Sequence, residues 1–240
     1  MADANPTRPR LFCALDTPSR DKALALARPL IGAVDGFKLG LEFFAAAGPD
    51  GVRAVGALGK PIFLDLKFHD IPNTVAGAVR STLPLAPAYL TLHAAGGVTM
   101  MQAAVEAAAE ADRLGVARPR LLAVTVLTSL DAGDLAAQAV QATPEEQVAR
   151  LATLAQRAGI DGAVCSPKEI APLRRVLGPG LALVVPGIRP AWAATDDQKR
   201  VMTPAEAAAA GADLLVIGRP ITAAADPAEA ARRIRAEMTA

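Results

Sequence analysis

The sequence predicts an α/β protein folded as a (β/α)8 TIM barrel, a closed sheet of eight parallel strands with helices around it. Three observations lead to this prediction. Eight short apolar runs recur along the 240 residues, helix signals fill the intervals between them, and no Pro- or Ser-rich linker divides the chain. Strands that are covered on both faces read as continuous apolar runs, and a barrel of this length commonly forms one domain. We therefore expect residues 1–240 to form a single barrel domain.

The apolar runs are the expected strands. They are LFCALD (11–16), GFKLGL (36–41), PIFLDLK (61–67), YLTLHA (89–94), LLAVTVL (121–127), GAVCS (162–166), LALVVPGI (181–188) and DLLVIG (213–218). Their alternation with helical segments implies parallel βαβ units. An open doubly wound sheet is the alternative, and it has less support because no G-x-G-x-x-G motif follows the first run.

Three intervals begin with the same helix-start pattern. TPEE at 143–146 and TPAE at 203–206 provide a Thr N-cap, a Pro at the first helical position and a Glu at the third. DPAE at 226–229 repeats the pattern with Asp as the cap. In such a capping box, the two side chains bond each other's free backbone N–H groups. Glycines fall where helices should end before the next strand, at 115, 159 and 211.

The composition argues against several classes of function. A net charge of +1 gives no footprint for nucleic acid or a membrane surface, and an aromatic content of 3% is too low for a base-stacking surface. Cys13 and Cys165 lie in apolar runs without C-x-x-C spacing, which is typical of buried core residues. Residues 81–105 lack charged side chains, but their prolines and glycines make a poor membrane helix. The start, MADANPTRPR, has no apolar leader, so we expect a cytoplasmic protein.

Two connections are longer than the usual βα loop. They span residues 128–143, after the fifth run, and 189–203, after the seventh. Both follow the C-terminal ends of strands, where barrels build their active sites. The second, RPAWAATDDQKRVMT, is polar and contains the only tryptophan, so it is a candidate lid. A surface loop without function is the alternative.

Ionisable residues gather in the third run and its continuation, FLDLKFHDIPNT (63–74). Because side chains alternate between the faces of a strand, Leu64 and Leu66 would pack on the helices, and Asp65 and Lys67 would face the barrel interior. In the second run, Gly36 and Gly40 flank Lys38 at two residues' distance on either side and leave it room.

Adjacent strands would bring these charges together. Asp16 ends the first run, so Asp16, Lys38, Asp65 and Lys67 would form a row of alternating charge. Buried charges are costly unless they are paired, and a purely structural ion-pair network is one reading of the row. Its position at the active-site end of a barrel favours catalysis. A lysine between carboxylates keeps its charged form and suits a general acid that protonates a carbanion.

Asp70 and the two histidines lie outside the row, although His69 shares the parity of Asp65 and Lys67 if the strand runs so far. Asp70 has the wrong parity and must lie in the loop before Pro72, where it can return to its own site or reach a neighbouring subunit's site. His69 and His93 are the only histidines. They lack metal-ligand spacing, so we expect hydrogen-bonded structural roles for them.

A phosphate site is expected on the other side of the barrel mouth. Barrels often bind phosphate with the loops after strands seven and eight. The seventh run leads into Gly187 and Arg189, and the eighth into Gly218 and Arg219. Glycine lets backbone N–H groups approach a phosphate, and arginine can hold it with two hydrogen bonds. Arginines on a solvated rim are the alternative.

These segments together resemble a known family. FLDLKFHDIPNT contains the D-x-K-x-x-D signature of the orotidine 5′-phosphate decarboxylases. The segments CALD, FKLGLE, LTLHAAGG, VTVLTS, VPGIRP and VIGRPIT occur in the order that this family shows, across nearly the whole chain. The resemblance implies a homodimeric barrel that converts orotidine 5′-phosphate to UMP and carbon dioxide in de novo pyrimidine biosynthesis, without a cofactor or metal.

The resemblance also implies a role for each site residue. Lys67 would protonate C6 of the pyrimidine, and Asp65 would lie beside the substrate carboxylate and hold Lys67 in place. Asp16 and Lys38 would contact the ribose hydroxyls, and Lys38 would also belong to the charged array. The partner subunit would supply Asp70, Ile71 and Thr74, and Thr128 would lie near the pyrimidine. The phosphate would be bound by Arg189, Gln198, Gly218 and Arg219.

Two other functions remain open from the sequence. A related branch of sugar-phosphate decarboxylases uses magnesium and a carboxylate on the second strand, but Lys38 takes that place here, and its charge disfavours a metal. A non-catalytic nucleotide-binding barrel would keep the Gly-Arg pairs, but it would not need both Asp65 and Lys67.

Overall fold

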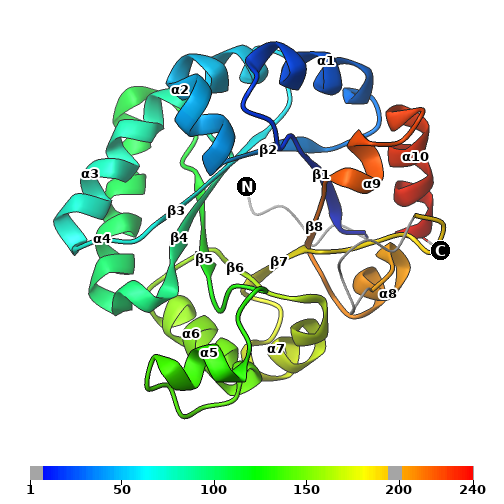
Figure 1. The fold of residues 1–240 in the computed structure, drawn as a ribbon. Helices are drawn as coiled ribbons and strands as arrows, with labels where there is room; N and C mark the ends of the chain where they lie inside the picture. The colour runs from blue at the N-terminus through cyan, green and yellow to red at the C-terminus, as the bar shows by residue number, and fades with distance from the viewer. Residues whose placement is uncertain (1–7, 194–201, 240) are drawn as a thin grey trace. The chain divides into compact units, whose positions relative to one another are not determined.

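Eight parallel strands close into a barrel in chain order, as predicted. The computed structural model describes residues 8–193 and 202–239. The strands, shown in Figure 1, are β1 (Arg10–Ala14), β2 (Gly36–Gly40), β3 (Ile62–Phe68), β4 (Tyr89–His93), β5 (Arg120–Val124), β6 (Gly162–Val164), β7 (Ala182–Pro186) and β8 (Leu214–Ile217). Each begins within one residue of a predicted run. Most end earlier than the run does, so Asp16 follows β1 instead of ending it.

Helices fill the intervals between strands. They are α1 (Arg20–Leu30), α2 (Leu41–Gly56), α3 (Pro72–Thr82), α4 (Gly97–Ala109), α5 (Ala132–Ala137), α6 (Pro144–Arg157), α7 (Ile170–Leu177), α8 (Pro204–Ala209), α9 (Arg219–Thr222) and α10 (Pro227–Glu237). Short 3-10 turns complete them: η1 (Leu83–Leu85), η2 (Ala94–Gly96), η3 (Glu110–Leu114) and η4 (Pro167–Glu169). Within the described ranges, no helix is both long and apolar enough to cross a membrane.

The predicted helix starts are present. At Thr143 and at Thr203, both bonds of the capping box form. The backbone N–H and the hydroxyl of Thr143 both donate to Glu146, and these bonds lower the pKa of its carboxyl group. At Asp226, the structure contains the first bond of the box, from the Glu229 N–H to the Asp226 carboxylate at 2.9 Å.

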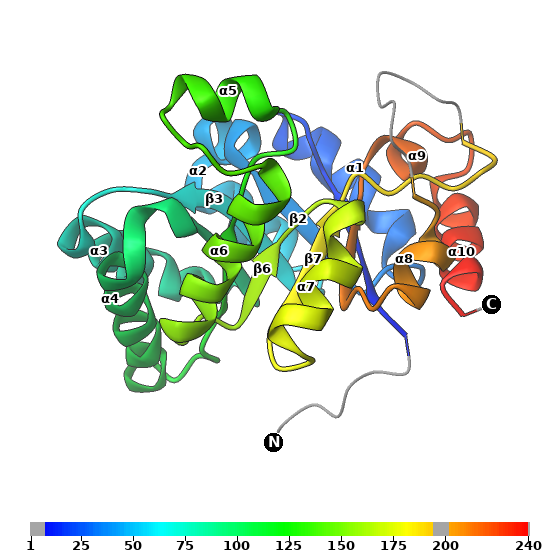
Figure 2. The same cartoon turned by 90° about the horizontal axis from the view of Figure 1, so that it is seen from below.

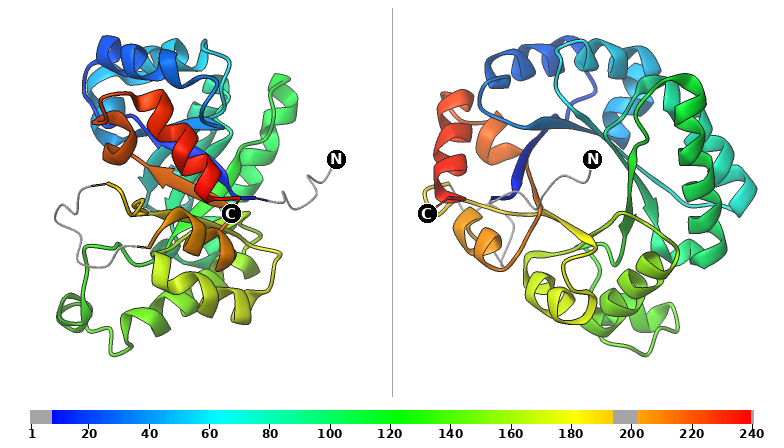
Figure 3. Two further views of the ribbon diagram at one scale, coloured as in Figure 1. Left: turned by 90° about the vertical axis from the view of Figure 1, so that its right-hand side faces the viewer. Right: turned by 180° about the vertical axis from the view of Figure 1, so that it is seen from behind.

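The chain divides into two compact units, which are described separately. Unit 1 comprises residues 1–66 and 185–240. In it, β1 pairs with β2 on one side and β8 on the other, so that Phe12 lies opposite both Gly36 and Val216. Helix α1 packs against α2 and α10, and Figure 3 shows α10 beside α1. The rings of Phe12 and Phe63 meet edge to face at 6.4 Å in the core of this unit.

Unit 2 comprises residues 67–184. Its strands β4, β5, β6 and β7 pair in that order, and α4 packs against both α3 and α6. The connection over residues 128–143 is not structureless, because it contains α5, which Asp131 caps. Figure 2 shows α5 beyond one end of α6.

Candidate active site

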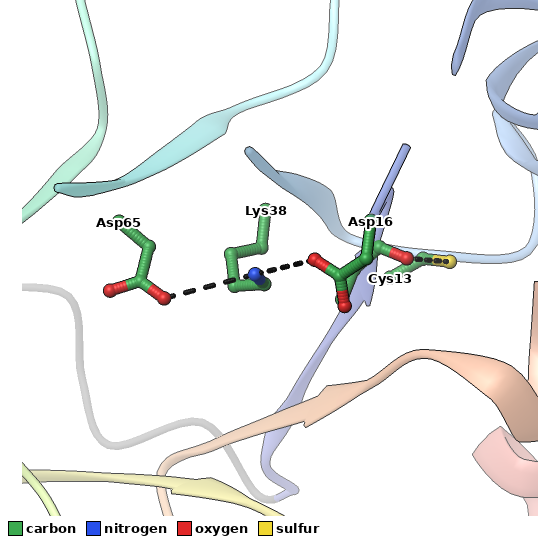
Figure 4. A network of polar contacts seen from close by, with 5 residues as sticks. Cys13, Asp16, Lys38 and Asp65 are labelled. Carbon is green, nitrogen blue, oxygen red and sulfur yellow. Dashed lines mark hydrogen bonds and ion pairs between the residues drawn. The ribbon is translucent and has the colours of Figure 1, made fainter. Parts of the chain in front are cut away.

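In unit 1, the ammonium group of Lys38 lies between two carboxylates (Figure 4). Its Nζ atom is 2.9 Å from Asp16 Oδ1 and 3.7 Å from Asp65 Oδ2. The Lys38 and Asp65 side chains are only 12% and 14% exposed, whereas Asp16 is 61% exposed. Three of the four residues in the predicted row therefore lie together, with the cation in the middle.

Strand register explains this arrangement. Lys38 pairs with Ala14 in β1, and Gly40 pairs with Asp65 in β3. Ala14 and Gly40 are the last residues of β1 and β2, whereas Lys38 and Asp65 lie in the middle of β2 and β3. In β2, the alternate residues Phe37 and Leu39 are fully buried in the core, so the face that carries Lys38 is the opposite one. The expected alternation therefore holds for the second strand.

The two glycines that flank Lys38 have different functions. A Cβ atom on Gly40 would lie 3.0 Å from Lys38 Nζ, so Gly40 leaves room for the lysine. A Cβ atom on Gly36 would lie 2.2 Å from the ring of Phe12 and 2.6 Å from the carbonyl oxygen of Pro61. Gly36 therefore makes room for the core and not for Lys38.

The contribution of each ion pair in the row to stability depends on how far its two side chains are buried. The pair between Lys38 and exposed Asp16 contributes little to stability, because water screens it. Lys38 and Asp65 are mostly withdrawn from water, and removing either one would leave a desolvated charge without this partner. A charge array of this kind is therefore a poor stabiliser of a fold.

The predicted phosphate residues also lie in unit 1. Gly187 has a φ of +77°, a conformation that favours glycine. Arg189 is buried, and its backbone N–H donates to the Met202 carbonyl. Gly218 lies beside Asp16, since a Cβ atom there would be 3.7 Å from Asp16 Oδ2. Arg219 is exposed and begins the short helix α9. Gln198 lies outside the described residues.

Trp192 is fixed to α10, a contact that the sequence does not predict. Its Nε1–H donates to Glu237 at 2.6 Å, and the Arg233 guanidinium lies 4.2 Å from the centre of its ring. Cation–π and hydrogen-bond contacts together anchor the beginning of the long connection after β7. The middle of the candidate lid, residues 194–201, lies outside the described residues.

In unit 2, Lys67 has a backbone conformation that the alternation argument does not foresee. Its φ is +50°, in the left-handed region, where an L-residue other than glycine is strained by about 1–2 kcal/mol. Its N–H donates to the hydroxyl of Thr91 at 2.9 Å. Strict alternation along β3 therefore stops before Lys67, and parity alone does not give the direction of its side chain. The only sign of Thr91 in the sequence is a hydroxyl between two leucines, Leu90 and Leu92.

The other predicted residues of unit 2 are accessible. Asp70 is exposed and accepts a 2.7 Å bond from the Ile71 N–H. Ile71 is 67% exposed, which is unusual for a large apolar side chain, and Thr74 is exposed in the first turn of α3. Thr128 is exposed after β5.

The two histidines form a ring pair in unit 2. The ring centroids of His69 and His93 are 5.4 Å apart, with 34° between the ring planes. Within residues 8–193 and 202–239, no group of three or more His, Cys, Asp or Glu side chains is arranged to hold a metal ion.

A (β/α)8 barrel in which a lysine of the second strand lies between a carboxylate just after the first strand and one from the third has the architecture of a barrel enzyme. Comparison with known proteins gives the family. The sequence model of the orotidine 5′-phosphate decarboxylase / HUMPS family matches residues 9–234. The chain belongs to this family.

Relatives and solved structures agree with this assignment. A protein named orotidine 5′-phosphate decarboxylase from Paramagnetospirillum magneticum is 57% identical over 229 residues, which cover 95% of this chain and 97% of that protein. A protein of the same name from Rhodospirillum rubrum is 56% identical over 240 residues, which cover 99% of this chain and 97% of that protein. A crystal structure of orotidine 5′-phosphate decarboxylase from Lactobacillus acidophilus matches with a TM-score of 0.84 and 37% identity, covering 97% of this chain and 100% of that one.

Proposed function

We propose that this protein decarboxylates orotidine 5′-phosphate to UMP and carbon dioxide in pyrimidine biosynthesis, without a cofactor or metal ion. The family and the names of its relatives support the substrate. The observation that carries the chemistry is the Lys38 ammonium between Asp16 and Asp65, with Lys67 following Asp65 by two residues in the same strand. We further propose that residues 1–240 work as one domain in the cytoplasm, where the two free cysteines would stay reduced.

Lys67 is the proton donor in this proposal. The bond between C6 and the carboxylate breaks, carbon dioxide leaves, and the electron pair stays on C6. The Lys67 ammonium stabilises this developing charge electrostatically and then transfers a proton to C6, which leaves a neutral amine that solvent reprotonates. Asp65 stands beside the substrate carboxylate, and the neighbouring Lys38 belongs to the same charged array.

The rest of the substrate supplies binding energy. Asp16 and Lys38 take the ribose hydroxyls, Thr128 lies near the pyrimidine, and Arg189, Gln198, Gly218 and Arg219 take the phosphate. The phosphate is remote from C6, so its binding energy can organise the charged array instead of only holding the substrate.

The active form in this proposal is a homodimer, and neither nucleic acid nor a membrane is a partner. Asp70, Ile71 and Thr74 reach the partner subunit's site. The exposure of all three side chains supports this, and the exposed Ile71 is the kind of apolar group that an interface covers.

The test is an ultraviolet assay of orotidine 5′-phosphate consumption in the presence of a chelator. We expect full turnover by the wild type and a loss of about 10³-fold or more in Lys67→Ala, because the fixed cation is removed. Circular dichroism would check that the variant is folded. Turnover that requires added Mg²⁺ would favour the magnesium-dependent branch, and unchanged turnover in Lys67→Ala would favour a non-catalytic binding protein.

A further inference from the structure

Lys67 is an unusual residue in its strand. Among residues 8–193 and 202–239, the non-glycine residues with positive φ are Lys67, Ala86 and Ala139. The two alanines follow short helical turns, where left-handed backbone is common, whereas Lys67 lies inside β3. Strained backbone of this kind persists only where its surroundings hold it.

Thr91 provides such a hold. Its hydroxyl accepts the Lys67 N–H at 2.9 Å, and the side chain is fully buried. Thr91 lies at the centre of β4, opposite Leu122 of β5, and its chain neighbours Leu90 and Leu92 are also fully buried. A β-branched side chain in a packed strand has little rotational freedom, so the position of the hydroxyl is fixed by the core.

The hydrogen bond between Lys67 and Thr91 is suited to positioning the Lys67 backbone. Lys67 donates to a side-chain oxygen, so the identity of residue 91 determines whether this bond forms. The direction of a side chain follows from the φ and ψ angles of its own backbone. Holding Lys67 at positive φ therefore sets the direction in which its long side chain leaves the strand.

We propose that Thr91 is a positioning residue, whose hydroxyl holds the Lys67 backbone in the left-handed conformation and so directs the ammonium group toward the reacting carbon. This inference rests on the proposed role of Lys67 as proton donor. In this proposal Thr91 acts through its hydrogen bond to the Lys67 backbone and needs no contact with the substrate.

The test compares Thr91→Val, which keeps the shape and loses the acceptor, with Thr91→Ser, which keeps the hydroxyl. We expect kcat to fall about 10- to 100-fold in Thr91→Val with KM changed less than about 3-fold, because misplacing a catalytic group weakens chemistry more than binding. Thr91→Ser should restore kcat to within about 3-fold of the wild type. The melting temperature of each variant would be measured alongside.

A purely structural role gives a different result. Equal kcat in the two variants, with changes confined to the melting temperature, would overturn the proposal. If Thr91→Val does not fold, Thr91→Ala repeats the test without added bulk, and failure of both to fold would assign the hydroxyl to folding and also overturn it. Lys67→Ala in the same series separates the two ideas. If Lys67→Ala is inactive and Thr91→Val is normal, only the positioning role is wrong, whereas normal turnover in Lys67→Ala would refute the proposed function itself.

Discussion

A Cβ atom on Gly40 would lie 3.0 Å from the Nζ atom of Lys38. The φ of Gly40 is −96°, so alanine can adopt the backbone there, and the cost falls on the lysine. We predict that Gly40→Ala displaces the Lys38 ammonium by a few tenths of an ångström and lowers kcat/KM about 10-fold, since catalytic groups tolerate little displacement. Steady-state kinetics with orotidine 5′-phosphate would measure this change.

The matched control for Gly40→Ala is Gly32→Ala, where a Cβ atom would meet nothing within 4 Å. The free energy of unfolding of each variant should lie within about 1 kcal/mol of the wild-type value, because each variant adds one methyl group without a backbone clash. If Gly40→Ala has the kcat/KM of the wild type, the prediction is wrong, and the predicted displacement of Lys38 does not affect catalysis.

Gly36→Ala should affect stability instead of kinetics. Its Cβ atom would overlap the Phe12 ring at 2.2 Å and the Pro61 carbonyl oxygen at 2.6 Å, and a backbone oxygen cannot rotate away. Overpacking of this kind costs about 3 kcal/mol. Urea denaturation would show a lower midpoint for Gly36→Ala than for Gly40→Ala, and a midpoint equal to the wild type would contradict the packing described for β1 and β2.

Mixed dimers test the proposed sharing of Asp70. If Asp70 serves the partner's site, a dimer of Asp70→Ala with Lys67→Ala has one site with neither substitution. An equal mixture should then recover about a quarter of the wild-type activity, because half of the dimers are hybrids with one intact site of two. The measurement is activity after refolding the mixture from urea. No recovery, with subunit exchange demonstrated by mass spectrometry, would place Asp70 in its own site.

Cys13 should make the fold sensitive to alkali. Burial, and then the negative charge of Asp16, raise the pKa of the Cys13 thiol from 9.0 to about 12. Between these values the folded protein keeps a proton that the unfolded chain releases, so this group lowers stability by about 1.4 kcal/mol for each pH unit above the unfolded pKa. Below pH 9 the thiol is protonated in both states and has no such effect.

The measurement is urea denaturation of the wild type and Cys13→Ala at several pH values from 8 to about 11. The alanine variant removes only this thiol, so its stability should fall less steeply with pH. Parallel curves for the two proteins would mean that the thiol ionises equally in both states.

Much of the fold was predictable from local chemistry. Apolar runs and capping boxes give the strands and the helix starts, because hydrophobic burial and helix caps act over a few residues at a time. Parity along the strand was sufficient for Lys38, where β2 is regular. The sequence by itself therefore determined the order of the strands around the barrel and the residue types available for the site.

The tertiary structure decided the features that depend on residues distant in sequence. Gly36 serves the Phe12 ring from another strand, Trp192 is held by the C-terminal helix, and the Lys67 backbone is bonded to Thr91, 24 residues away. No pattern in a single strand shows that its regular alternation will be broken. The physical reason is that a strained φ is stable only when a distant, packed group holds it, and packing between strands is not encoded in any one segment.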